Sequence, residues 1–212
     1  LEVRAGVVDD ASKLGMNIVI SELIPRNVSD ISARLTKFGA LRPDLLLISG
    51  RSRGVFMAAR RIKKMKIDVP MIAMTDCEEA RVIAKLGALA NGVLCPTQWA
   101  RTLRYKDDMF GTATEYDNLF KTTFNGYRKT PIQAAQATAA VMVWKDALER
   151  ANSFEIENVR AALAATNMNT FYGGIKFSPK GNNLAKPMVL RQIQNGKLNV
   201  VAPLRWASHR IR

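Results

Sequence analysis

The sequence predicts an α/β protein built on a doubly wound parallel sheet. Short apolar runs bounded by turn residues alternate with helical segments through the first 100 residues. Strands that alternate with helices at this spacing form right-handed βαβ units, and an unbroken apolar run indicates a strand covered on both faces. A chain of 212 residues, 48% hydrophobic and 24% charged, is large enough to bury such a sheet.

Four helices and four strands are expected in this first part, each bounded by residues that favour caps or turns. Gly15 suits the left-handed position that ends a helix, and Ser29 and Asp30 are N-cap residues for the next one. The expected helices cover about 2–14, 31–38, 55–65 and 78–86, and the expected strands cover 17–20, 45–48, 69–75 and 92–95.

The pattern changes after Trp99. A polar segment over 101–111 is expected to connect two bodies. Thr112 and Glu115 then have the spacing of a capping box, which predicts a helix that begins there.

The next helix is alanine-rich and runs to about residue 150. Thr130 and Gln133 repeat the capping-box spacing, with Pro131 at the first helical position, and we expect the helix to be largely buried. A further helix is expected over 155–165, capped by Asn152 and Ser153. Strands are expected over 174–177, 188–194 and 198–201, with a hairpin turn at Asn195 and Gly196 between the last two. Core or hinge positions are expected for Trp144, Phe171 and Tyr172.

Few residues suited to catalysis or metal binding are present. His209 is the only histidine and lies in a basic tail, so neither a Ser-His-Asp triad nor a histidine metal site is expected. The sequence has no Gly-rich phosphate loop or nucleophile elbow. We therefore expect no enzymatic activity, no metal and no cofactor.

The two cysteines, Cys77 and Cys95, are too few for a disulfide scaffold and lack metal-ligand spacing. We expect two buried free thiols. A disulfide between them in an oxidising compartment is the alternative.

The net charge of +14 raises the question of an anionic partner. The densest basic cluster is Arg60, Arg61, Lys63, Lys64 and Lys66, and no zinc finger, RNP-type motif or basic zipper accompanies it. A solvated basic face is the favoured interpretation, and a nucleic-acid-binding protein is the alternative.

A family resemblance rests mainly on the last third of the chain. The long helix over 137–151 ends in ALERA, VRAAL follows at 159–163, and then come TFYGGIKFSPKG at 170–181, QIQNGK at 192–197 and VVAP at 200–203. Earlier, Leu14-Gly15 to Ile20, Ser29-Asp30 and Arg42-Pro43-Asp44 occur in a matching order. This series resembles the periplasmic solute-binding proteins of branched-chain amino acid ABC transporters.

The resemblance implies a type I periplasmic-binding-protein fold, in which two α/β lobes are joined by crossing strands and hold the ligand between them. It assigns 1–100 and 174–212 to the second, C-terminal lobe and 101–173 to a segment that returns to the first. Most of the first lobe, and the strand before Glu2, have no counterpart here. We therefore expect an incomplete two-lobe architecture.

Candidate ligand-binding residues follow the predicted strands, because ligands of open parallel sheets bind beyond the carboxyl ends of the strands. The resemblance implies an acid after the strand over 69–75 that faces the ligand's ammonium, and Asp76 matches it; a helix N-cap is its alternative role. Arg51 stands where the family has an aromatic residue, and its guanidinium suits a carboxylate, although a solvated arginine is equally expected. Ser52 can donate its hydroxyl to the ligand or hydrogen-bond to the backbone of its own loop. Trp99 can line the ligand site beside an apolar or aromatic ligand, or pack in the protein interior.

The sequence and the resemblance together predict an extracytoplasmic receptor of an ABC importer. It would capture a branched-chain amino acid or related small carboxylate by lobe closure and present it to a membrane permease in the periplasm. No nucleic acid is expected as a partner, and pairing of two copies as a homodimer is left open. A ligand sensor of the same fold in signalling is a further alternative.

Overall fold

The computed structural model describes residues 2–25, 28, 30–77, 83, 84 and 86–212. The chain forms two compact units: unit 1 comprises Leu1–Pro96 and Leu190–Arg212, and unit 2 comprises Thr97–Val189. The segment 174–189, which we expected in the same lobe as the first 100 residues, lies in unit 2 because its strand at 173–176 pairs with the strand before it.

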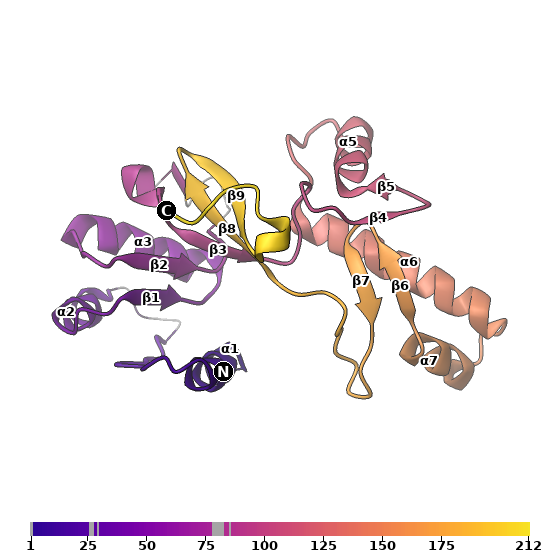
Figure 1. Cartoon of the computed structure of the whole chain (residues 1–212), viewed down its shortest axis with the longest axis horizontal. Coiled ribbons are helices and arrows are strands. Elements are labelled where there is room, and N and C mark those ends of the chain that lie inside the picture. The colour runs from indigo at the N-terminus through magenta and orange to yellow at the C-terminus, as the bar shows by residue number, and fades with distance from the viewer. Residues whose placement is uncertain (1, 26–27, 29, 78–82, 85) are drawn as a thin grey trace. The chain divides into compact units, whose positions relative to one another are not determined.

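Unit 1 is built on a five-stranded sheet (Figure 1). Its strands, in spatial order, are β1 (Leu45–Ile48), β2 (Met71–Met74), β3 (Leu94–Thr97), β8 (Val189–Gln194) and β9 (Lys197–Ala202). β1, β2 and β3 pair parallel, whereas β8 and β9 form an antiparallel hairpin. Asn195 and Gly196 have φ values of 52° and 73°, as the predicted hairpin turn requires. The predicted parallel sheet is confirmed.

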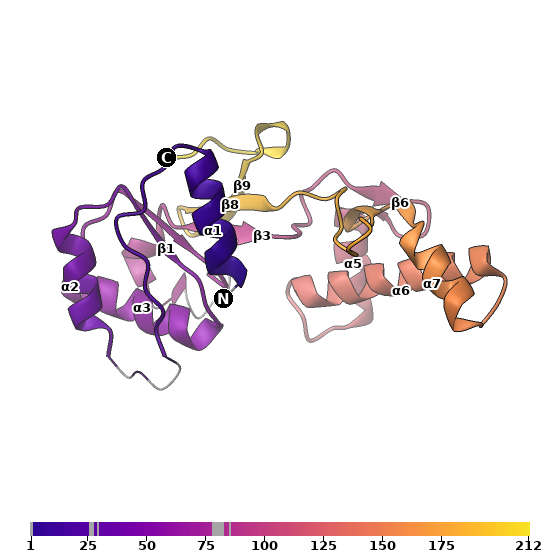
Figure 2. The same cartoon turned by 90° about the horizontal axis from the view of Figure 1, so that it is seen from below.

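The helices of unit 1 follow the predicted alternation (Figure 2). They are α1 (Glu2–Lys13), α2 (Ser32–Ala40) and α3 (Ser52–Met65), with short 3₁₀ turns η1 (Gly87–Ala90) and η2 (Leu204–Trp206). The Asp30 carboxylate accepts the Ser32 backbone N–H at 3.0 Å at the start of α2. Ser29 and most of the helix expected over 78–86 lie outside the described residues.

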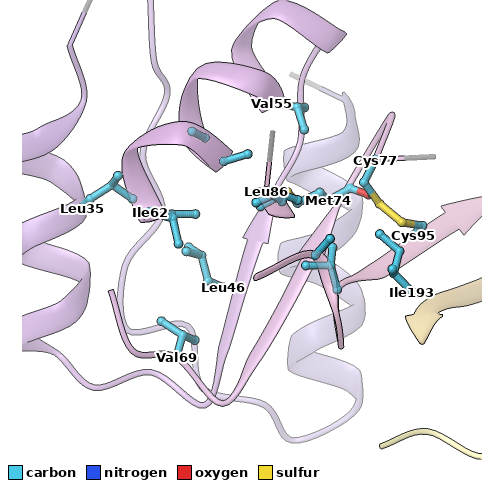
Figure 3. Packing of buried hydrophobic residues seen from close by; sticks show 14 of the residues in the cluster. Leu35, Leu46, Val55, Ile62, Val69, Met74, Cys77, Leu86, Cys95 and Ile193 are labelled. Atoms are coloured by element: carbon cyan, nitrogen blue, oxygen red, sulfur yellow. A yellow bond between two sulfur atoms is a disulfide. The ribbon is translucent and has the colours of Figure 1, made fainter. Parts of the chain in front are cut away.

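One face of α3 packs on the sheet and forms the core of unit 1 (Figure 3). Val55 and Ile62, two turns apart on that face, are fully buried with Leu46 of β1 and Met74 of β2. The opposite face carries the basic cluster, in which Arg60, Lys63, Lys64 and Lys66 are exposed and Arg61 pairs with Asp30 at 3.2 Å. α3 is therefore amphipathic, with the solvated basic face that its sequence predicts.

The expectation of two free thiols is wrong. Cys77, just after β2, and Cys95, in β3, form a disulfide and are both fully buried. Parallel neighbouring strands place the two side chains close together, with Cα atoms 5.7 Å apart. The disulfide covalently joins the end of β2 to β3.

The strand predicted at 17–20 is also wrong. Residues 16–24 are not part of any helix or strand, and β1 is the last strand at that side of the described sheet. An apolar run forms a strand only when another strand offers it hydrogen-bonding partners. Ile18, Val19, Leu23 and Ile24 consequently remain exposed.

Unit 2 surrounds an aromatic core. Tyr116 and Phe171 stack with ring centroids 3.7 Å apart, and Trp99 contacts both rings edge-on. Phe171 and Tyr172 are buried, as predicted. The elements of unit 2 are β4 (Lys106–Asp107), β5 (Gly111–Thr112), α5 (Ala113–Thr123), α6 (Ile132–Ala151), α7 (Ile156–Ala164), β6 (Asn167–Thr170) and β7 (Gly173–Lys176).

The two predicted capping boxes have different outcomes. At α5 the box is confirmed, because Thr112 accepts the Glu115 N–H and Glu115 accepts the Thr112 N–H. At α6 it is wrong: Pro131 occupies the N-cap position, and the Thr130 hydroxyl donates to the buried Asp117 carboxylate at 2.8 Å. The Thr130 hydroxyl thus binds Asp117 and does not cap α6.

α6 is buried on one face only, contrary to expectation. Ala135, Ala139 and Ala147 are buried, whereas Val141 is exposed and Trp144 is 51% exposed. The helix is apolar on several sides, so its sequence does not indicate which side is covered. Among the described residues, no helix has both the length and the apolar character needed to cross a bilayer.

We predict that the double substitution Cys77→Ala and Cys95→Ala lowers the free energy of unfolding by about 3 kcal/mol, because the disulfide closes a loop of moderate length. Urea denaturation of both proteins measures the difference. As a control, a reducing agent should destabilise the wild-type chain and leave the variant unchanged. Equal denaturation midpoints for the two oxidised proteins would contradict a stabilising disulfide.

Candidate functional site

The candidate site lies at the carboxyl ends of β1 and β2. The two strands pair parallel from Leu45 with Met71 to Ile48 with Met74, so both chains leave the sheet at the same edge. The loop after β1 carries Arg51 and Ser52, and the loop after β2 carries Asp76. Ligands of open α/β sheets bind at this edge.

Thr75 ties the two loops together, a role that the sequence did not reveal. Its hydroxyl donates to the Gly50 carbonyl at 2.8 Å and lies 3.0 Å from the Gly50 N–H, and its own N–H donates to the Ile48 carbonyl at 3.1 Å. A threonine at the last position of the strand predicted over 69–75 is the only signal for it in the sequence. The tie holds the Arg51 loop beside the Asp76 loop.

Arg51 is the N-cap residue of α3. Its backbone is extended and its carbonyl accepts the N–H groups of Gly54 and Val55. Its side chain is exposed and forms no ion pair with any described carboxylate. Ser52 begins α3, but its side chain lies outside the described part of the structure. A free guanidinium beside a helix N-terminus has the electrostatic character of an anion site.

Asp76 adopts a left-handed backbone conformation, with φ of 53°, and is partly buried. Aspartate tolerates this region better than most residues, and such conformations cluster at functional sites. The next residue, Cys77, is held by the disulfide, which fixes the position of Asp76 along the sheet edge. The alternative role of Asp76 as a helix N-cap concerns residues outside the described part of the chain.

Trp99 belongs to unit 2 and is 2% exposed. Its indole N–H donates to the Phe171 carbonyl at 3.1 Å, and its ring packs in the aromatic core. The structure thus brings the loops of Arg51 and Asp76 together in unit 1 but gives Trp99 a packing role in unit 2. In this conformation its ring offers almost no surface to a solute.

Lys186 is a partly buried lysine in unit 2, with a buried Nζ, that the sequence did not single out. Its Nζ lies 2.9 Å from the centroid of the Tyr172 ring, and the Tyr172 hydroxyl donates to Gln98 at 2.8 Å. Among the described residues, Nζ has no hydrogen-bond partner. Burial lowers the pKa of Lys186 to about 7 and raises the pKa of Tyr172 to about 12. The face of the Tyr172 ring attracts the protonated amine, so this contact acts against the lowering of the Lys186 pKa by burial.

Metal binding finds no support in the described part of the chain. There, no three His, Cys, Asp or Glu side chains come together as a ligand cluster. The side chains of Arg51 and Asp76 are of the types that form charge-assisted hydrogen bonds.

Unit 1 thus has an α/β fold with charged loops at the carboxyl ends of two parallel strands. The model of the periplasmic binding protein family matches residues 1–197, and the chain belongs to this family. Its fold is the type I periplasmic-binding-protein fold.

Solved structures support the fold. The chain is similar to a leucine-binding protein from Thermotoga maritima, with 22% identity, a TM-score of 0.78 and coverage of 92% of this chain and 54% of that one. A solute-binding protein from Rhodopseudomonas palustris in complex with benzoate has 15% identity and a TM-score of 0.71, with coverage of 92% and 52%. A leucine-, isoleucine-, valine-, threonine- and alanine-binding protein from Brucella ovis has 15% identity and a TM-score of 0.73, with coverage of 94% and 51%. The chain thus spans about half the length of these proteins.

We predict that the stability of unit 2 rises as the pH increases from about 7 towards 10.5. The folded chain releases the Lys186 proton near pH 7, whereas the unfolded chain keeps it until the ordinary pKa of 10.5. The unfolded state binds more protons in this window, so the free energy of unfolding increases with pH.

The variant Lys186→Met should remove most of this rise, because it has no amine to desolvate. Unfolding of the wild type and the variant between pH 6 and 9.5 measures the effect, with Lys180→Met in the same loop, where the side chain is exposed, as the control. A pH dependence that is identical in wild type and Lys186→Met would contradict the prediction.

Proposed function

We propose that this protein is part of an extracytoplasmic solute-binding receptor of an ABC importer and captures a branched-chain amino acid or a related small carboxylate. The observation that carries the proposal is the tie between the loops of Arg51 and Asp76, which holds two opposite charges at one sheet edge. An amino acid carries the complementary pair of charges.

The proposed contacts follow from this pairing. The Arg51 guanidinium binds the solute carboxylate by two parallel N–H donors, and Asp76 accepts hydrogen bonds from the solute ammonium. Ser52 adds a hydroxyl donor to the carboxylate. Trp99 is buried in the aromatic core of unit 2, so we assign it a packing role and no contact with the solute. No bond is made or broken, so the protein acts as a receptor and not as an enzyme.

The similar proteins favour the same class of solute. One is named for leucine, another for leucine and four further amino acids, and a third is in complex with benzoate. All of these solutes carry a carboxylate, and the amino acids also carry an ammonium. Capture by closure of two lobes, delivery to a membrane permease and a periplasmic location complete the proposal.

A thermal-shift screen of the 212-residue chain against leucine, isoleucine, valine and benzoate tests the proposal. A solute at about 100 times its dissociation constant adds about 2.7 kcal/mol to the free energy of unfolding. We expect stabilisation by at least one of the four. Unchanged melting with all of them at millimolar concentration would contradict solute binding by this chain.

The variant Asp76→Asn separates the two solute classes. It should weaken binding of an amino acid by about 10- to 100-fold, because a charge-assisted hydrogen bond contributes about 1.5 to 3 kcal/mol, and should leave benzoate binding unchanged. Isothermal titration calorimetry measures both affinities. Arg51→Gln should weaken both solutes.

Asp68→Asn is the matched control, since Asp68 is an exposed acid in unit 1 that precedes β2 instead of following it. It should bind both solutes like the wild type. If Asp68→Asn and Asp76→Asn weaken amino acid binding equally, the charge of the whole unit is responsible and the assigned role of Asp76 is wrong.

A further inference from the structure

α3 carries a line of cations on the side that faces solvent. Arg53, Arg60 and Lys64 are exposed, and at 3.6 residues per turn they lie within about 40° of one another around the helix axis. Val55 and Ile62 lie on the opposite side of the axis, where both are buried against the sheet (Figure 3). We call Arg53, Arg60 and Lys64 the basic stripe.

Two further cations lie beside the basic stripe. Lys63 is exposed on α3, and Lys66 is the exposed C-cap residue. Arg61 instead pairs with Asp30 at 3.2 Å. Because α3 contains no acidic residue, its exposed side carries positive charges only.

The cations of the other helices are paired with acids. In each of α1, α5, α6 and α7, a cation pairs with a carboxylate three or four residues away in the same helix: Lys13 with Asp9, Lys121 with Asp117, Arg150 with Asp146 and Arg160 with Glu157. In the described part of the chain, no carboxylate lies within ion-pair distance of the basic stripe. The unpaired charges therefore distinguish α3 from the other helices.

Helix stability does not account for the basic stripe. Arg60 and Lys64 are like charges four residues apart, which destabilises a helix. The helix dipole favours cations in the last turn, as at Lys64, but disfavours Arg53, which lies in the first turn. An anionic surface along α3 would attract all three cations and offset both unfavourable effects.

We propose that the basic stripe is an electrostatic docking surface for the anionic headgroups of a phospholipid bilayer, with α3 lying along the membrane surface. The basic stripe with Lys63 and Lys66 supplies five cations, and a cluster of four to eight on one helix is typical of surfaces that bind anionic lipids. From Arg53 to Lys64 the helix rises about 17 Å, so the line of charge needs an extended anionic partner. The net charge of +14 adds long-range attraction to such a surface.

A bilayer fits the basic stripe better than a nucleic acid does. Proteins that hold single-stranded nucleic acids combine cations with aromatic side chains on which bases stack. The residue between Arg53 and Arg60 on the same side of α3 is Met57, which is half-buried and apolar. An apolar side chain beside cations suits the boundary between headgroups and acyl chains.

Membrane docking goes beyond solute capture. It would hold a receptor near the permease to which it delivers its solute, and this benefit rests on the proposed function. The binding itself does not, since measurements with vesicles contain no solute. The two proposals can therefore fail separately.

Co-sedimentation of the full chain with vesicles tests the docking surface. Vesicles that contain one third phosphatidylglycerol in phosphatidylcholine are compared with vesicles of phosphatidylcholine alone. Each cation at an anionic bilayer increases the affinity about fivefold, so the chain should bind the anionic vesicles at least 100-fold more tightly in 50 mM sodium chloride. Raising the salt to 300 mM should weaken this binding at least tenfold.

Two double variants with equal charge changes locate the binding. Arg60→Gln with Lys64→Gln should weaken binding to the anionic vesicles about 30-fold. Lys180→Gln with Lys197→Gln removes two exposed cations outside α3 and should remain within threefold of the wild type. Glutamine favours helices and relieves the like-charge pair, so the first variant should melt no lower than the wild type.

Three results would overturn the proposal. The first is equal binding to the two kinds of vesicle. The second is an equal loss in the two double variants, which would assign the binding to net charge and not to α3. The third is tighter binding to a short DNA duplex than to anionic vesicles at the same phosphate concentration, which would make nucleic acid the partner.

Discussion

The parallel pairing of β1 with β2 is the constraint on which the rest of unit 1 depends. Its register, from Leu45 with Met71 to Ile48 with Met74, brings the ends of both strands to one edge. There the Thr75 hydroxyl joins the two loops, and the Cys77–Cys95 disulfide joins β2 to β3. α3 then covers the sheet with Val55 and Ile62. Without that register, the loops that carry Arg51 and Asp76 would not leave the sheet side by side.

Much of the fold can be predicted from the sequence where local patterns and tertiary packing agree. The run of Leu45 to Ile48 is apolar and forms β1, with Leu46 buried in the core, and Asn195-Gly196 has the backbone that a tight hairpin needs. The run over 17–20 has an equally apolar pattern but no adjacent strand, and strand formation needs one. The exposure of Trp144 could not be predicted either, because α6 is apolar on several sides and burial depends on what packs against it.

The sequence assigns the candidate residues to the ends of predicted strands, but it does not reveal how the loops that carry them are held. The rule that ligands bind beyond the carboxyl ends of parallel strands led directly to Arg51, Ser52 and Asp76. The tie through Thr75 and the disulfide depend on distances across the sheet, which sequence separation does not determine. Trp99 follows a strand as well, but its indole hydrogen bond to Phe171 and its burial depend on contacts with residues more than 70 positions away.

Titration of the ¹⁵N-labelled chain with leucine, followed by two-dimensional NMR, tests whether the solute binds at this sheet edge. We expect the largest shift changes at the amides of Gly50, Arg51 and Asp76, at the ends of β1 and β2. Changes confined to residues outside these two loops, or no change at millimolar leucine, would contradict leucine binding at the sheet edge.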